Sequence, residues 1–408
     1  MFMKHSYINL SLLIIILFVF SNFAESKSKT ANKKRDFTSL IPKDYLREPN
    51  EIPAFWVSTV DDVVAFLKKT VKKGTLEVIG KTAGNRPIYA VKYGQGRQGK
   101  GTTTLSGSLS FGNIGAYRGE DNDKTVYMSM AGVHGGEFEG IVGLVNLISV
   151  LETGKDIRGK EWPKILEAAS KLNRIIIIPI VNSDARIRIP LRMEAYRGTD
   201  NTVAEFFSTG GKADGSLIGW PQVKEFIPFN YTKNGFPGGY PNDNGYNLQH
   251  DNFFGKKQPE NQALFDLTER EKPDLIMNLH TGGFQFMLHS NFGETKLIPV
   301  FDKVFKSVHT ELTVRGLQQS TDTIVEANPL RSSKFDYNLD GALNLHCGAL
   351  TILLEAPSHS FSGKYNDGKV WFHSPEMLLD GELICQQKAM EFLVSKGGRS
   401  KWKSIISK

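Results

Sequence analysis

The stretch of sequence that decides the fold is Arg174-Ile-Ile-Ile-Ile-Pro-Ile-Val181, which is apolar at every position after its first residue. A strand with one face in water alternates apolar and polar residues, and this run does not alternate. Continuous apolar runs are typical of strands that helices cover on both faces of a sheet. The run therefore predicts a central strand of an α/β fold.

Further strands and helices are predicted on both sides of this run. Short apolar or alternating segments predict strands at 75–79, 87–91, 125–131, 274–279 and 349–354. Apolar residues at helical spacing predict helices at about 60–71, 140–151, 160–172, 258–271 and 299–316. Strands that alternate with helices indicate a sheet with helices on both faces. The segment 198–246 lacks periodicity and is expected to be an irregular part of the active-site surface.

The N-terminal residues have the pattern of an export signal. Lys4 and His5 precede an apolar run at 8–20, and small residues follow it. We expect a secreted or periplasmic protein, and an uncleaved anchor that leaves the same domain outside is the alternative. The predicted parts are a signal peptide at 1–24, a linker at 25–50, a catalytic domain at 51–396 and a basic tail at 397–408.

Composition narrows the range of partners. The chain has 408 residues, of which 40% are apolar, and its formal net charge is +7. Because it has no basic stripe interleaved with aromatic residues, we expect no nucleic-acid partner. We expect a monomer without stable membrane insertion once the signal is removed. Cys347 and Cys385 are too few for a disulfide framework or a structural zinc site.

Imidazole and carboxylate side chains lie at the ends of three predicted strands. His134 and Glu137 follow the first of these strands, His280 ends the second, and Glu355 follows the third. In open α/β sheets, ligands bind beyond the carboxyl ends of the strands. We therefore expect the four side chains to meet at one rim of the sheet.

This set of residues suits a catalytic zinc site. Two histidines and one carboxylate are a common ligand set, and the fourth position stays open for water. A further carboxylate can take the proton of that water as it attacks a carbonyl carbon. In His134-Gly-Gly-Glu137, the two glycines let the backbone approach the metal. The pair alone could be a solvated turn, but the pattern over three strand ends predicts a hydrolase that cleaves an amide bond.

The order of several motifs resembles the M14 zinc carboxypeptidases and their deacylase relatives. The resemblance runs from about Phe55 to about Phe392. It implies a mixed, mostly parallel, twisted sheet of eight strands with helices on both faces. The motifs that carry it are Ile79-Gly-Lys-Thr-Ala-Gly-Asn-Arg-Pro-Ile, His134-Gly-Gly-Glu137, Ile-Pro-Ile-Val-Asn182-Ser-Asp184, Gly245-Tyr-Asn-Leu-Gln-His-Asp-Asn-Phe253, Pro259-Glu260-Asn-Gln-Ala, His280 and Glu355.

The resemblance also implies roles for the residues at the strand ends. His134, Glu137 and His280 would bind one Zn²⁺ per chain. Glu355 would activate the attacking water as general base and then pass the proton to the leaving nitrogen. Glu139 could compete with Glu137 as the carboxylate ligand, and the resemblance favours Glu137.

Two further roles in the resemblance have less certain positions in this chain. The family uses an arginine after the Asn-Pro-Asp-Gly turn to stabilise the oxyanion. We prefer Arg192 for this role, with Arg188 second, and spacing alone leaves Arg186 and Arg197 open. Tyr337 is the candidate for a tyrosine that closes over the substrate, and an ordinary surface-loop tyrosine is the alternative.

The chain departs from the family where true carboxypeptidases hold the terminal carboxylate of the substrate. An Asn-Arg pair does so in the family, whereas this sequence has Gln249-His250. Arginine is always charged and donates two parallel hydrogen bonds to a carboxylate, while histidine is mostly neutral at pH 7. A deacylase, an amidase or a cell-wall peptidase therefore stands beside a carboxypeptidase. The expected substrate is a peptide or an acyl-amino acid.

Two other classes of protein are less consistent with the sequence. A non-catalytic relative that binds peptide or glycan would be favoured by loss of a ligand or of Glu355, and all four residues are present. A serine hydrolase is disfavoured because the sequence has no Gly-x-Ser-x-Gly elbow.

Overall fold

A computed structural model of the chain describes most of the sequence after the first 35 residues. The predicted signal peptide and the first part of the predicted linker lie outside the described residues. The described ranges are 36–99, 101–111, 113–119, 124–219, 222–224, 228–231, 234–290, 295–318, 337–364, 368–402 and residue 405.

A seven-stranded mixed sheet forms the centre of the fold, with strand order β1-β2-β4-β3-β5-β7-β6. Strands β4, β3, β5 and β7 are parallel to one another, and antiparallel strands flank them on both sides. The strands are β1 Thr75–Lys81, β2 Pro87–Gly94, β3 Val126–Ala131, β4 Arg174–Ile178, β5 Leu275–Thr281, β6 Met287–His289 and β7 Leu350–Ala356. The expectation of eight strands is corrected to seven in this sheet over the described residues.

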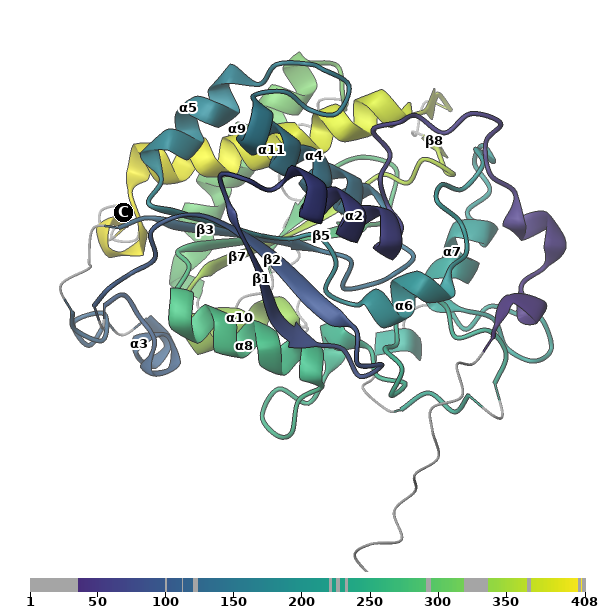
Figure 1. The fold of residues 1–408 in the computed structure, drawn as a ribbon, viewed down its shortest axis with the longest axis horizontal. Helices are drawn as coiled ribbons and strands as arrows, with labels where there is room; N and C mark the ends of the chain where they lie inside the picture. The colour runs from purple at the N-terminus through teal and green to yellow at the C-terminus, as the bar shows by residue number, and fades with distance from the viewer. Residues whose placement is uncertain are drawn as a thin grey trace, which may run out of the picture. The chain divides into compact units, whose positions relative to one another are not determined.

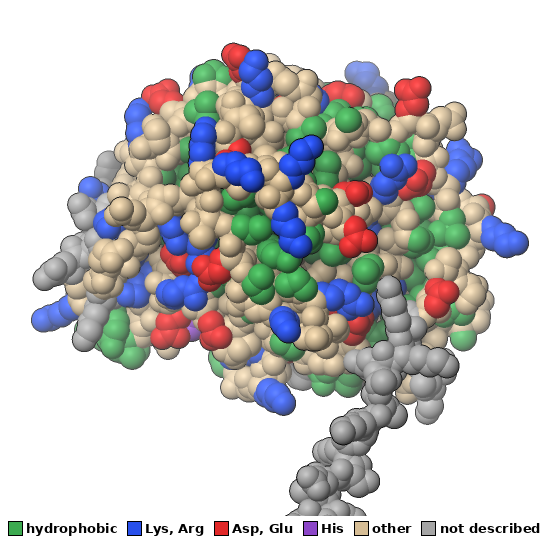
Figure 2. Space-filling model, viewed as in Figure 1, with side chains coloured by type: hydrophobic (Ala, Val, Ile, Leu, Met, Phe, Trp, Pro, Cys, Tyr) green, Lys and Arg blue, Asp and Glu red, His purple; other side chains and the backbone are tan. Residues whose placement is uncertain are grey.

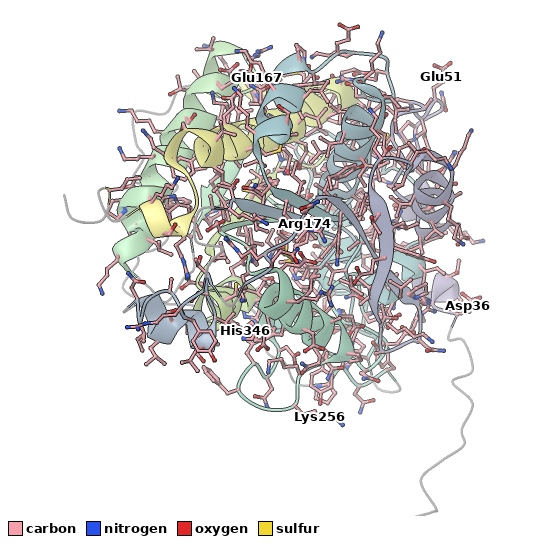
Figure 3. All side chains as sticks on the ribbon, turned by 60° about the vertical axis from the view of Figure 1, so that its left-hand side comes forward. Asp36, Glu51, Glu167, Arg174, Lys256 and His346 are labelled. Carbon is pink, nitrogen blue, oxygen red and sulfur yellow. The ribbon has the colours of Figure 1, made fainter. Side chains whose placement is uncertain are left out.

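The apolar run that begins at Arg174 forms β4, one of the inner strands of this sheet. Residues 175–178 are buried, as expected for a strand covered on both faces. Its first residue, Arg174, labelled in Figure 3, pairs with Glu271 at the end of helix α8 (Pro259–Glu271), with an Nε–Oε2 distance of 3.1 Å. Arg174 therefore lies at the amino end of β4, and the apolar residues that follow it enter the core.

Helices cover both faces of the sheet, as Figure 1 shows. Helices α4, α5, α9 and α11 lie on one face, and α8 and α10 lie on the other. The bounds are α2 Val60–Thr70, α3 Leu105–Phe111, α4 Glu139–Thr153, α5 Pro163–Lys171, α6 Ser183–Arg188, α7 Thr202–Thr209, α8 Pro259–Glu271, α9 Ile298–Val314, α10 Leu339–Cys347 and α11 Pro375–Lys396.

Short elements complete the described part of the chain. The 3-10 helices are η1 Thr38–Leu40, η2 Lys43–Leu46, η3 Gln222–Lys224, η4 Leu248–His250, η5 Thr295–Leu297 and η7 Arg399–Lys401. Strands β8 Gly363–Lys364 and β9 Val370–Trp371 form a small antiparallel pair. Both cysteines are buried and carry free thiols. No helix among the described residues is long and apolar enough to span a bilayer.

Local sequence explains how the chain turns at the site end of the sheet. Asn182 caps α6, because its side chain accepts a hydrogen bond from the backbone of Ala185. Gly132, just after β3, has a φ of +62°, a left-handed conformation that favours glycine. This bend takes the chain from β3 into the loop that carries His134.

Candidate metal centre

Three buried side chains converge at the carboxyl ends of β3 and β5. The Nδ1 atom of His134 lies 2.8 Å from Oε1 of Glu137, and Nδ1 of His280 lies 2.9 Å from Oε2 of the same carboxylate. The two Nδ1 atoms are 3.2 Å apart. One ligand atom from each residue therefore lies within 4.8 Å of the others. The prediction that these residues form one metal site is confirmed.

Two glycines allow the His134–Glu137 loop to approach its neighbours closely. A Cβ on Gly135 would lie 2.2 Å from the backbone nitrogen of Arg186, and a Cβ on Gly136 would lie 2.6 Å from the carbonyl oxygen of Phe207. Such contacts are far too short for any side chain. Glycine at both positions is thus required by the packing of the loop against α6 and α7.

The carboxylate of Glu137 stays ionised between the two imidazoles. Burial alone would raise the pKa of Glu137, but the two imidazoles outweigh it and lower that pKa to about 2. Burial alone would lower the pKa of His280, but Glu137 outweighs it and raises that pKa to about 9. The buried carboxylate thus holds positive charge beside it. Because the donors are two imidazole nitrogens and one carboxylate, they fit Zn²⁺.

A neighbouring amide orients one of the imidazoles. Nε2 of His134 lies 3.3 Å from Oδ1 of Asn247, so its N–H donates to that oxygen when Nδ1 faces the metal site. The ring of Tyr240 lies over the same imidazole, with ring centroids 3.8 Å apart. Sequence reasoning missed both residues. The signal for Asn247 was its place in the Gly245–Phe253 motif, where the family has aspartate.

Glu355 stands beside the metal residues on the adjacent strand. It pairs with His280 in the register of β5 and β7. Gly282 leaves room for its carboxyl group, because a Cβ on that glycine would lie 2.9 Å from Oε2 of Glu355. Burial raises the pKa of Glu355 to about 7; His280 opposes this rise, and the charges of Glu137 and Asp340 add to it. A carboxyl group with this pKa can both accept and donate a proton near neutral pH.

The two predicted substrate residues of η4 lie in different surroundings. Gln249 is buried, and its Nε2 donates to Oδ2 of Asp340 at 2.7 Å, while its Oε1 accepts from Asn278 at 3.3 Å. Its amide therefore belongs to a polar network beneath the site. His250 is half-buried at the end of η4.

The arginine candidates make different contacts. Arg186 is fully buried, and its guanidinium donates to the carbonyl oxygens of Ser58, Ile189 and Leu191. Arg192 is 55% exposed in its side chain and pairs with Glu48 at 3.5 Å.

The remaining two arginines, Arg188 and Arg197, also donate to backbone carbonyl oxygens. Arg188 donates to the carbonyl oxygens of Gly238 and Pro241, which flank the tyrosine that covers His134. Arg197 donates to the carbonyl oxygen of Asp44. The choice of Arg192 or Arg188 for the oxyanion stays a prediction.

Tyr337 lies within a group of aromatic rings. Its ring stacks on that of Phe254 with centroids 5.1 Å apart, and it meets Phe253 edge-on at 6.0 Å. The ring also packs against the core cluster beneath α8 and α10. Its role over the substrate stays a prediction.

A buried set of two histidines and one glutamate, with a further carboxyl group beside it, defines a mononuclear zinc hydrolase site. The chain belongs to the M14 zinc carboxypeptidase family, whose profile matches residues 64–345. It is thus a zinc metallopeptidase by family, with His134, Glu137 and His280 as the metal-binding residues. This confirms the resemblance seen in the sequence.

Solved structures are similar to this chain at low sequence identity. A carboxypeptidase candidate of Burkholderia mallei ATCC 23344 is 14% identical, with a TM-score of 0.51 over 82% of this chain and 68% of that chain. Carboxypeptidase A of Helicoverpa armigera is 14% identical, with a TM-score of 0.47 over 97% of this chain and 83% of that chain. A metallo-carboxypeptidase of Pseudomonas aeruginosa, in complex with (2-guanidinoethylmercapto)succinic acid, is 12% identical, with a TM-score of 0.49 over 82% and 69%. No curated protein sequence matches the chain.

Proposed function

We propose that this protein is an exported zinc hydrolase that cleaves an amide bond of a peptide-like substrate, with Glu355 as its general base. The observation that carries the proposal is the place of Glu355, one strand away from His280 in direct register. A buried carboxyl group beside the metal residues is positioned to receive the proton of an attacking water. Retention of this residue with all three ligands argues against a non-catalytic relative.

The proposed mechanism assigns each step to a residue of the site. Zn²⁺ bound by His134, Glu137 and His280 would supply Lewis acidity and lower the pKa of water toward neutrality. Glu355 accepts the proton of the attacking water and returns it to the leaving nitrogen. Burial of Glu355 favours the protonated form that this group takes on when it receives the proton.

The proposed substrate class does not require a free C-terminal carboxylate. Gln249 uses its amide within the protein, on Asp340 and Asn278, so it is committed to structure. His250 replaces the arginine that would hold a carboxylate through two hydrogen bonds. An acyl-amino acid, an amidated peptide or a cell-wall peptide therefore suits this site at least as well as a free C-terminus.

The proposed export rests on residues 1–24, whose pattern of charge, apolar core and small residues is that of a signal peptide. If it holds, N-terminal sequencing of mature protein from its source will start beyond this segment. A mature chain that retains the apolar run at 8–20 would favour the anchor instead.

Replacing the proposed base tests the mechanism. We expect Glu355→Gln to keep about one Zn²⁺ per chain and to lower turnover by about 10²–10⁴-fold, because an amide cannot accept the proton. Metal content is measured by elemental analysis and turnover with an N-acyl-amino-acid or peptide panel.

A matched control is available on α4. Glu152 is a buried glutamate that accepts hydrogen bonds from the backbone of Lys72, Lys73 and Gly74, away from the metal residues. Glu152→Gln should therefore leave turnover unchanged. Undiminished turnover in Glu355→Gln would remove Glu355 from its role, and wild-type protein without zinc would remove the proposed function altogether.

A further inference from the structure

The buried carboxylate of Glu139 links the ends of the three strands that carry the site. Glu139 follows β3 in the chain, and its side chain accepts hydrogen bonds from the end of β5 and from the segment after β7. Glu139 is the first residue of α4, two positions after Glu137, and it is only 4% exposed. Its Oε2 accepts a hydrogen bond from Oγ1 of Thr281 at 2.9 Å, and its Oε1 accepts one from the backbone nitrogen of His359 at 3.0 Å. Thr281 directly follows a zinc ligand, and His359 lies four residues after the proposed base.

We propose that Glu139 is a positioning residue that holds Glu137, His280 and Glu355 in register for metal binding and catalysis. The inference rests on the proposed role of Glu355, but its metal-binding part is independent of that role.

The two sides of the β5 strand end explain why such a residue is needed. Side chains alternate along a strand, so His280 points to the metal site and Thr281 points to the opposite face, where α4 packs. Gly140 of α4 lies close against Leu279 of β5, where a Cβ would come within 2.6 Å of the leucine Cβ. The start of α4 is therefore in direct contact with β5, and Glu139 connects the two through Thr281.

The second hydrogen bond of Glu139 holds the segment that follows β7. Beyond Ala356, the pairing with β5 ends with the bond from the backbone of Gly282 to the carbonyl oxygen of Ala356. The bond to the backbone of His359 then holds the segment that leaves β7. The imidazole of His359 is held as well, because its Nδ1 lies 3.0 Å from the carbonyl oxygen of Glu194.

A small shift of α4 would therefore move the metal ligands and the proposed base together. A catalytic set must be held to within about 0.5 Å, and side chains that support ligands typically change metal affinity or activity by about 10–100-fold when they are lost. Glu139 was considered in the sequence as a competing ligand. Its two bonds place it instead on the far side of the strand end from the metal.

The test uses three variants of Glu139 and Thr281 in the full chain. Glu139→Leu removes both bonds and Thr281→Val removes one. Glu139→Gln can keep both, because its amide oxygen can accept from the His359 backbone while its NH₂ donates to the Thr281 hydroxyl. The primary readout is the dissociation constant for Zn²⁺, from competition with a chromogenic chelator in the absence of substrate.

We expect Glu139→Leu to weaken Zn²⁺ binding by about 10–100-fold and to lower kcat with little change in KM. Thr281→Val should weaken binding in the same direction, and Glu139→Gln should recover most of what Glu139→Leu loses. Glu152→Leu, at the other end of α4, is the control for lost stability, and it should lower the thermal midpoint without changing Zn²⁺ affinity.

Two results would overturn the proposal. The first is equal loss of Zn²⁺ affinity in Glu139→Leu and Glu152→Leu, which would mean a general structural effect. The second is damage by Glu139→Gln as large as that by Glu139→Leu, which would mean that charge, not the two bonds, matters. If Glu139→Leu fails to fold, Thr281→Val and Glu139→Gln decide the question. Because the chelator assay needs no substrate, a wild-type protein without amide hydrolysis would leave this test intact.

Discussion

Two glutamates of the site show how surroundings divide one residue type into two roles. Glu137 lies between two imidazoles, which keep it ionised as a ligand. Glu355 lies beside other carboxyl groups in a buried position, and its pKa rises to about 7. Pairs of titratable groups whose environments separate their pKa values are typical of acid–base sites. The ligand and the base are therefore distinguished by their neighbours, not by their chemistry.

The amide of Asn247 offers a prediction at this scale. Its Oδ1 accepts from Nε2 of His134, which fixes the tautomer that presents Nδ1 to the metal. We expect Asn247→Ala to weaken Zn²⁺ binding by about tenfold. We expect Asn247→Asp to bind Zn²⁺ at least as tightly as the wild type, since a carboxylate raises the basicity of the imidazole. The measurement is competition with a chelator, and equal affinities in all three proteins would contradict this role for Asn247.

The sequence predicted those site residues that a short stretch of chain marks as functional. His280 and Glu355 end apolar runs, and His134 and Glu137 share one short loop, so their positions followed from strand ends. Asn247 lies 113 residues from His134 in the chain. A contact of this kind depends on how an irregular loop folds back, and no periodicity predicts it.

At the scale of elements, strong periodicity was the reliable guide. The runs at 125–131, 274–279 and 349–354 became β3, β5 and β7 with ends shifted by one or two residues. Helix α11 was not predicted, because residues on all its sides are buried and the helical period is blurred. The irregular segment 198–246 contains α7, whose eight residues are too short for a clear pattern.

Gln249 and His250, which lie in the 3-10 helix η4, lead to a prediction on substrate preference. Gln249 donates to Asp340, and the imidazole of His250 cannot form the two parallel hydrogen bonds by which an arginine holds a carboxylate. We expect the enzyme to cleave C-terminally amidated peptides or N-acyl-amino acids at least as well as peptides with a free C-terminus. kcat/KM for matched substrate pairs is the measurement.

The control for this prediction is His250→Arg, which restores the residue that the family has at this position. It should raise kcat/KM for free C-termini relative to amidated ones, because a guanidinium can form two hydrogen bonds to a carboxylate. A strong preference of the wild type for free carboxylates would show that another group binds them, and the argument from η4 would fail.

In the whole molecule, the site lies at one end of the sheet and the supporting helices lie on its two faces. The parallel strands deliver the site residues at one end of the sheet, and helices cover both faces (Figure 1). On the face drawn in Figure 2, Lys and Arg side chains are interspersed with acidic ones. The sequence predicted this α/β architecture because the inner strands are apolar throughout. Six of the seven strands were predicted from apolar or alternating runs, and the edge strand β6 was missed because it is only three residues long.

Buried carboxyl groups make the stability of the whole fold depend on pH, and Glu382 of α11 has a large effect among the described residues. Burial raises its pKa from 4.5 to about 8, and the nearby charge of Glu139 adds to the rise. Its surroundings also include Tyr127 and Cys385, neither of which supplies positive charge. The folded protein therefore keeps the proton of Glu382 in a range where the unfolded chain has lost it.

The sign of the effect follows from this difference in proton binding. Between pH 4.5 and about 8 the folded state binds more protons at Glu382 than the unfolded state, so this group makes stability fall as pH rises. We expect the thermal midpoint of Glu382→Gln to exceed that of the wild type already at pH 6, and we expect the difference to grow until about pH 8. Glu271 provides the opposite control, because its bonds to Arg174 and Lys92 outweigh burial and lower its pKa. Glu271→Gln should therefore be less stable than the wild type throughout pH 6–9, by an amount that hardly changes with pH. Thermal unfolding of the zinc-loaded proteins over this range measures both effects, and a pH-independent difference between wild type and Glu382→Gln would show that Glu382 is already ionised in the fold.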